Sequence, residues 1–175
     1  MRRIAEELAV RPGLISHYFP AVEDLVAEAY GDAVGAELDA LLPADRAGAS
    51  PTRHLARFFA RATGPAFDDI SRLWLNARHL SRYRPALREW VAVQEAAWRD
   101  RLESLIRDGV EQGEFRTDDP MVAAIQILVV LDGLGMLVNS ADTEDDPPAV
   151  RRLPITTAER ELGLAEGALT AADTD

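Results

Sequence analysis

Residues 4–19, IAEELAVRPGLISHYF, are the stretch around which the rest of the chain is organised. The apolar residues Ile4, Ala5 and Leu8 recur at helical spacing and predict a first short helix with these side chains facing inward. A short turn follows. Pro12 then suits the start of a second helix, because proline lacks the N–H group that would be unpaired at that position. The sequence therefore predicts two short helices joined by a tight turn.

The second helix is predicted to end before Pro20, with Ile15 and Phe19 facing inward. This arrangement matches the helix-turn-helix plan, in which the second helix lies in the major groove of DNA. Its first turn would offer N–H groups to a phosphate, and its outward side chains would reach base edges. A helix pair without any role in DNA binding fits the same periodicity. On the DNA interpretation, the contacting residues are Arg3, Arg11, Pro12, Gly13, Leu14, Ser16, His17 and Tyr18.

The longer string IAEELAVRPGLISHYFPAVEDLVAEAY, from Ile4 to Tyr30, resembles the TetR/AcrR family of bacterial regulators. The resemblance rests on the opening Ile-Ala pair, on Gly13 and Phe19 in the second helix, and on Leu25 in the helix that follows. It implies a DNA-binding transcriptional regulator, chiefly a repressor, that binds a palindromic operator in double-stranded DNA as a homodimer. It also implies a C-terminal helical domain that dimerises and can bind a small-molecule effector.

The sequence departs from the family pattern at three points. Family members carry a further helix before this stretch, and Met1 falls just before the family's second helix, so the first helix is expected to be lacking. The family turn usually has glycine where this chain has Ala9, and a left-handed backbone there would cost alanine about 1–2 kcal/mol. A lysine that commonly contacts phosphate is replaced by Val22. These departures keep open the alternative that the chain dimerises or binds an effector without binding DNA.

Charge and composition limit the class of protein. The net charge of −11 has the wrong sign for a general nucleic-acid binder, and only residues 1–20, with three Arg and two Glu, lean positive. The chain has no cysteine, which excludes disulfides, Cys-ligated zinc and thiol nucleophiles. Its first residues carry charges instead of the continuous apolar core of a signal peptide, so a cytoplasmic location is expected.

Helical spacing continues along the whole chain and predicts an all-α fold with two domains. Residues 1–42 are expected to form the helix-turn-helix domain with a connecting helix over 21–42, which in the family transmits ligand binding. Residues 43–175 are expected to form a C-terminal helical bundle for regulation and dimerisation. No segment has a pattern that clearly indicates a β-strand.

Two segments of the C-terminal domain, Met121–Asn139 and Thr157–Leu169, are expected to form the homodimer surface, as the resemblance implies. The first is apolar almost all round, which is typical of a helix buried on several sides. A membrane span is not expected, because two polar residues interrupt the run and no basic residues flank it. A capping box formed by Thr156 and Glu159 predicts the start of a single last helix.

The sequence predicts a ligand pocket and no enzyme, metal site or cofactor. The three His residues lack metal-ligand spacing, and no catalytic or phosphate-loop motif is present. Asp132 lies in a very apolar segment, so it either pairs with an arginine across the dimer or faces a cationic or hydroxylated effector. The pocket candidates are Phe59, Trp74, Asn76, His79, Tyr83, Trp98, Gln126 and Asp132. Ordinary packing in the core or in an interface is the alternative for each.

Overall fold

The computed structural model describes residues 1–46, 48, 50–64, 67–140 and 147–171, and these residues form helices and loops. The predicted all-α fold is confirmed. The helices are α1 (Arg2–Glu7), α2 (Pro12–Tyr18), α3 (Val22–Leu41), α4 (Pro51–Ala62), α5 (Phe67–Ser81), α6 (Pro85–Glu111), α7 (Pro120–Val138), α8 (Pro148–Arg151), α9 (Leu153–Glu161) and α10 (Ala168–Ala171).

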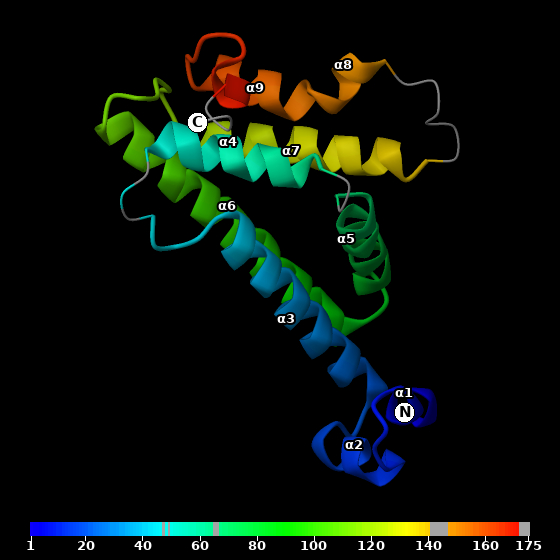
Figure 1. Ribbon diagram of the computed structural model, residues 1–175. Coiled ribbons are helices and arrows are strands. Elements are labelled where there is room, and N and C mark those ends of the chain that lie inside the picture. The colour runs from blue at the N-terminus through cyan, green and yellow to red at the C-terminus, as the bar shows by residue number, and fades with distance from the viewer. Residues whose placement is uncertain (47, 49, 65–66, 141–146, 172–175) are drawn as a thin grey trace.

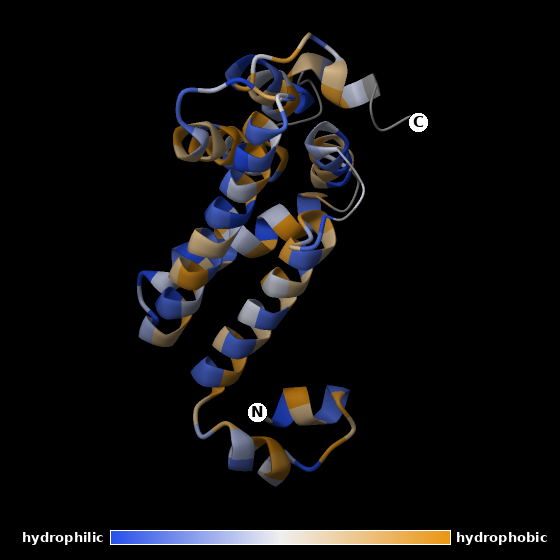
Figure 2. Cartoon of the chain, turned by 90° about the vertical axis from the view of Figure 1, so that its left-hand side faces the viewer, coloured by the Kyte–Doolittle hydropathy of each residue, from blue (hydrophilic) through white to orange (hydrophobic). Residues whose placement is uncertain are grey.

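Helix α3 connects two parts of the molecule. Figure 1 shows the α1–α2 pair at one end, with α3 leading from it to the remaining helices. Figure 2, turned by 90°, shows the same separation. Along its length α3 packs against α6, and α7 packs against α5, α6 and α9. A displacement of α3 relative to α6 would therefore move the α1–α2 pair. The division into domains at residue 42 stays a prediction.

The α1–α2 pair has the predicted form, with one exception. Ala5 and Ile15 are buried, and Pro12 occupies the first turn of α2. Leu8 was expected to face inward. This prediction is wrong for the described residues, because α1 ends at the preceding residue and the Leu8 side chain is 63% exposed. Ala9 has a φ of 52°, so the turn carries the strain expected of an alanine in the left-handed region.

The starts of α4 and α7 are fixed by side-chain caps. The Ser50 hydroxyl accepts a hydrogen bond from the Arg53 N–H at 3.2 Å. The Asp119 carboxylate accepts hydrogen bonds from the first two N–H groups that follow Pro120, at 3.0 and 3.1 Å. These bonds satisfy donors that have no partner inside a helix.

The C-terminal segment differs from the predicted single helix. The helix α9 already begins at Leu153, and the Thr156 hydroxyl bonds backward to a carbonyl of the preceding turn instead of capping a helix start. Glu159 accepts a hydrogen bond from the Leu169 N–H at 3.0 Å, so it holds α10 against α9. Gly163 has a φ of 64°, which ends α9 where the prediction continued the helix.

The most apolar helix, α7, has one side inside the molecule and one side exposed. Among the helices that the structure describes, α7 is the one that is long and apolar enough to cross a membrane. Its contacts with α5, α6 and α9 bury one side of the helix, and 33% of its apolar stretch lies inside the molecule. The exposed side is called the α7 stripe here, and it comprises Val122, Ile125, Gln126, Val129, Gly133, Met136 and Leu137.

Candidate functional site

The candidate DNA-contacting residues are all exposed in the structure. From Arg11 to Leu14, and from Ser16 to Tyr18, every side chain is exposed, whereas Ile15 faces α1 and is buried. Arg3 is exposed on α1. The Ser16 hydroxyl donates a hydrogen bond to the Pro12 carbonyl at 3.3 Å, so it is partly engaged within α2. The arrangement leaves this face of α2 free for a partner, and its role in DNA binding stays a prediction.

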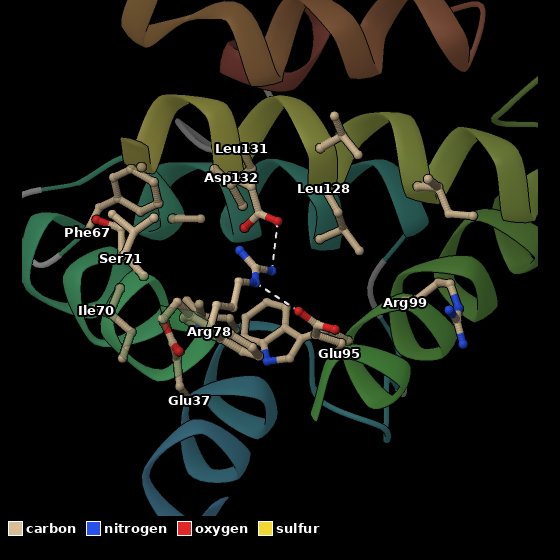
Figure 3. Close-up of a pocket in the computed structure, with 18 residues that line it drawn as sticks. Glu37, Phe67, Ile70, Ser71, Arg78, Glu95, Arg99, Leu128, Leu131 and Asp132 are labelled. Atoms are coloured by element: carbon tan, nitrogen blue, oxygen red, sulfur yellow. Dashed lines mark hydrogen bonds and ion pairs between the residues drawn. The ribbon is translucent and has the colours of Figure 1, made fainter. Parts of the chain in front are cut away.

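A second candidate site is a cavity of about 330 Å³ enclosed mainly by α3, α5, α6 and α7. This volume falls in the range of pockets for small ligands. Its lining combines apolar side chains such as Phe67, Ile70 and Leu131 with a small number of charged groups. Figure 3 shows these side chains converging between α7 on one side and α5 and α6 on the other.

Arg78 on α5 is the centre of the charged groups. Its Nη2 lies 2.8 Å from Oδ2 of Asp132 on α7, and its Nε lies 2.8 Å from Oε1 of Glu95 on α6. The guanidinium carbon is 5.1 Å from the centre of the Trp74 ring. Burial lowers the pKa of Arg78, but the hydrogen bonds and charges of the two carboxylates outweigh burial and raise that pKa. The site therefore contains a permanent cation.

Two aromatic side chains of the cavity lining continue into a series of ring contacts with α3. Trp74 contacts Tyr30 of α3 edge to face with ring centres 5.7 Å apart, and Trp98 of α6 with ring centres 6.5 Å apart. The Tyr30 hydroxyl and the Trp98 indole nitrogen are buried without a hydrogen-bond partner among the described residues. Burial raises the pKa of the Tyr30 hydroxyl, which therefore stays protonated. These rings join α3 to the cavity.

Glu37 is the carboxylate that α3 itself contributes to the cavity. Its Oε2 is buried and has no hydrogen-bond partner among the described residues. Burial raises the pKa of Glu37 to about 7, and a hydrogen bond from the Trp74 side chain opposes this rise. Part of the Glu37 population is therefore neutral at neutral pH.

Changing Glu37 to Gln is expected to remove a pH dependence of stability. Because the folded-state pKa of about 7 lies above the ordinary value of 4.5, the folded chain binds more protons, and stability falls as pH rises between these values. The full shift corresponds to about 3 kcal/mol, and partial solvent contact reduces the effect to about 1–2 kcal/mol. Urea unfolding from pH 5 to 8 should show a flatter profile for the variant. The exposed Glu28→Gln on the same helix serves as a control that leaves the slope unchanged.

The structure gathers three of the predicted pocket residues and separates the other five. Trp74, Trp98 and Asp132 line the cavity. Phe59 is buried in the core at another place. The other four side chains point to solvent, away from this cavity, because they lie on the outer faces of α5 and α7 or in the loop after α5: Asn76, His79, Tyr83 and Gln126. In the single chain Asp132 pairs with Arg78, and the two partners expected for it, an arginine across the dimer and a cationic or hydroxylated effector, stay predictions.

Sequence reasoning missed Glu37, Arg78 and Glu95. A signal was present for one of them, since Trp74 and Arg78 are four residues apart and share a helix face. Glu37 belongs to a run of acidic residues that reads as a solvated face. Among the described residues, no cluster of three or more His, Asp or Glu side chains could hold a metal ion.

Comparison with known proteins agrees with this architecture of a small helical pair, a connecting helix and a larger helical domain with a cavity. A model of the C-terminal domain of BetI-type transcriptional repressors matches residues 60–162, which is more than half of the chain. The chain therefore belongs to the TetR family of transcriptional regulators, and members of this family are regulators and not enzymes. No curated protein matches the sequence significantly.

Solved structures share the fold at low sequence identity. A transcriptional regulator from Saccharomonospora viridis in complex with choline has a TM-score of 0.74 and 24% identity, over 91% of this chain and 84% of that chain. A TetR regulator from Haloarcula marismortui has a TM-score of 0.77 and 19% identity, over 92% of this chain and 86% of that chain. GusR from Salmonella enterica has a TM-score of 0.70 and 17% identity, over 93% and 84%.

Proposed function

We propose that the chain is a cytoplasmic, ligand-responsive repressor that binds a palindromic operator as a homodimer. The observation that carries this proposal is that one helix, α3, serves both candidate sites. It begins directly after the exposed face of α2, and it contributes Tyr30 and Glu37 to the surroundings of the cavity. Residues 1–42 would act as the DNA-reading domain and residues 43–175 as the regulatory and dimerisation domain.

The mechanism is a shift between two arrangements of α3. An effector in the cavity would favour one arrangement by its contacts there, and it would bind the other more weakly. Two recognition helices must stand about 34–36 Å apart to enter successive major grooves. A displacement of α3 changes this separation, so the arrangement favoured by the effector would release the operator.

For the homodimer, the α7 stripe is the proposed contact, and α9 beside it extends the surface. Apolar side chains dominate the stripe, and Gly133 leaves space within it. For the effector, the first candidate is a small organic cation, since the relative from Saccharomonospora viridis was crystallised with choline. Two guanidinium groups, three carboxyl groups and several aromatic rings line the cavity, which makes it suitable for a charged organic molecule.

A gel-shift titration tests DNA binding. The purified chain is expected to retard DNA from the region upstream of its own gene, with affinity that falls steeply as salt rises. The variant Arg11→Ala should bind more weakly and lower the slope of log affinity against log salt by about 1, because a phosphate contact is lost. Arg57→Ala, which removes an exposed arginine of α4 far from α2, is the control and should bind as the unchanged chain does.

A folded dimer that retards no DNA even at low salt would contradict DNA binding. That result would favour the alternative of a family member that dimerises or binds an effector without contacting DNA. Equal losses for Arg11→Ala and Arg57→Ala would show that binding is not directed by α2.

A further inference from the structure

The charged groups at the cavity are those that recognise an organic cation, yet the protein's own Arg78 already occupies the position between them. The Asp132 and Glu95 carboxylates each lie 2.8 Å from the guanidinium, and the Trp74 ring lies under it at 5.1 Å. Two carboxylates and an aromatic face are the usual surroundings of bound ammonium and guanidinium groups. Figure 3 shows Arg78 between Asp132 and Glu95.

The charges around Arg78 do not balance. One guanidinium faces two carboxylates, and Glu37 adds a third carboxyl group to the lining. Arg99 also lines the cavity, but its guanidinium lies 3.5 Å from Asp100, in a pair of neighbouring residues on α6. The surroundings of Arg78 therefore favour positive charge beyond the one that they hold.

Solvent reaches all three members of this group. The side chains of Arg78, Glu95 and Asp132 are 34%, 44% and 48% exposed, respectively. Ion pairs with this much solvent contact contribute about 1 kcal/mol or less each. A soluble cation can therefore reach the carboxylates, and the resident guanidinium is held weakly enough to be exchanged.

We propose that Trp74, Glu95 and Asp132 form a cation subsite that Arg78 fills in the absence of effector, and that the effector is an organic cation which displaces Arg78. This inference rests on the proposed ligand-responsive function and its cationic effector, and it adds the residues that bind the cation and the residue that the cation displaces. The incoming cation takes the two carboxylates and the Trp74 face, and the Arg78 head moves into solvent.

The exchange has a structural consequence for α3. Arg78 ties α5 to α6 through Glu95 and to α7 through Asp132. The residue beside Glu95, Gln94, donates a buried hydrogen bond of 3.1 Å to the Gly31 carbonyl on α3. Displacement of Arg78 releases α5 from α6 at the point where α6 holds α3, which gives a route from the subsite to the α1–α2 pair.

The test uses the full chain and the variant Arg78→Met, which keeps a long apolar stem and removes the charge. Choline and methylguanidinium are the probes, and isothermal titration calorimetry measures their affinity. We expect the variant to bind both cations at least about 10-fold more tightly than the unchanged chain, because no resident cation competes. The uncharged isostere of choline, 3,3-dimethylbutan-1-ol, should gain little. Arg57→Met, which removes an exposed arginine of α4 outside the cavity lining, is the control and should leave all affinities unchanged.

A second variant distinguishes the effect of removing the Arg78 charge from the effect of the space that the substitution opens. Arg78→Met combined with Asp132→Asn should lose most of the gain in cation affinity. If Arg78→Met does not fold, Arg78→Lys replaces it, since a lysine bridges two carboxylates less well and should give a smaller gain. Equal gains for choline and its uncharged isostere would overturn the proposal. Weaker cation binding by Arg78→Met or Arg78→Lys than by the unchanged chain would also overturn it, because Arg78 would then support the ligand.

The gel-shift titration with operator DNA tests the repressor function independently of the cation-binding experiment. If Arg78→Met binds cations more tightly but no form of the chain binds operator DNA, the cation subsite is supported and the repressor function is contradicted. If the chain binds the operator and only uncharged or anionic molecules release the chain from DNA, the repressor function is supported and the cation subsite is contradicted.

Discussion

Replacing Gly31 with alanine is expected to destabilise the chain by about 2–3 kcal/mol. Gly31 lies on α3 against α6, and a Cβ atom there would stand 2.1 Å from the ring of Trp90. The contact is with a large, partly buried ring, so α3 and α6 must separate or Trp90 must leave its place. Urea unfolding followed by circular dichroism measures the loss.

A glycine one turn further along the same helix gives the control. At Gly35 the nearest atom to an added Cβ is Gln94 Nε2 at 3.7 Å, which is ordinary contact. Gly35→Ala should therefore be neutral or stabilising by up to about 1 kcal/mol, because alanine favours the helix. Combining Gly31→Ala with Trp90→Leu should cost less than the sum of the two single changes. If Gly31→Ala matched Gly35→Ala in stability, the close packing of α3 on α6 would be refuted.

Regular helices were predictable from the sequence because their signals are local. The proline residues at the starts of α2, α4 and α7, with Ser50 and Asp119 before the last two, set helix ends through groups within three residues. The apolar spacing of α3 and α6 likewise depends only on the helical repeat. Such features do not require knowledge of the partner surface.

The C-terminal segment was mispredicted because its side chains bond at long range. Thr156 and Glu159 have the spacing of a capping box, but Glu159 bonds instead to the Leu169 N–H, ten residues away. Gly163 and Gly167 both have positive φ and so break the expected helix. Only the packing of α9 on α7 and of α10 on α4 decides between these alternatives.

The sequence predicts only part of the cavity, because some of its residues acquire their role through contacts between different helices. Trp74, Trp98 and Asp132 stand out as aromatic or charged residues within apolar helices, whereas Glu37 and Glu95 are ordinary in helices that carry many charges. Arg78 acquires its role from Glu95 and Asp132, on two other helices. Helix spacing predicts which residues share a face, but it leaves open which faces meet.

Changing Val129 to Asp is expected to convert the proposed homodimer into a monomer. Val129 lies at the centre of the α7 stripe, is 62% exposed in the single chain, and also lines the cavity. In a dimer formed through this stripe, the new carboxylate would be buried beside its symmetry mate, so two like charges would lose their contact with water. Burial of an unpaired charge costs at least about 3 kcal/mol, which corresponds to a rise in the dissociation constant of more than about 100-fold. Sedimentation equilibrium at micromolar concentration measures the change.

Val93→Asp provides the matched control, since Val93 lies on α6 outside the stripe and is 59% exposed. The substitution is the same, the exposure is nearly equal, and both positions lie within a long helix. Circular dichroism should show that both variants keep their helical content, so that dissociation is not a result of unfolding. A dimer that survived Val129→Asp, or that Val93→Asp dissociated equally well, would place the interface elsewhere. In that case the exposed apolar side of α7 would require another partner to explain it, because contiguous exposed apolar surfaces usually mark interaction sites.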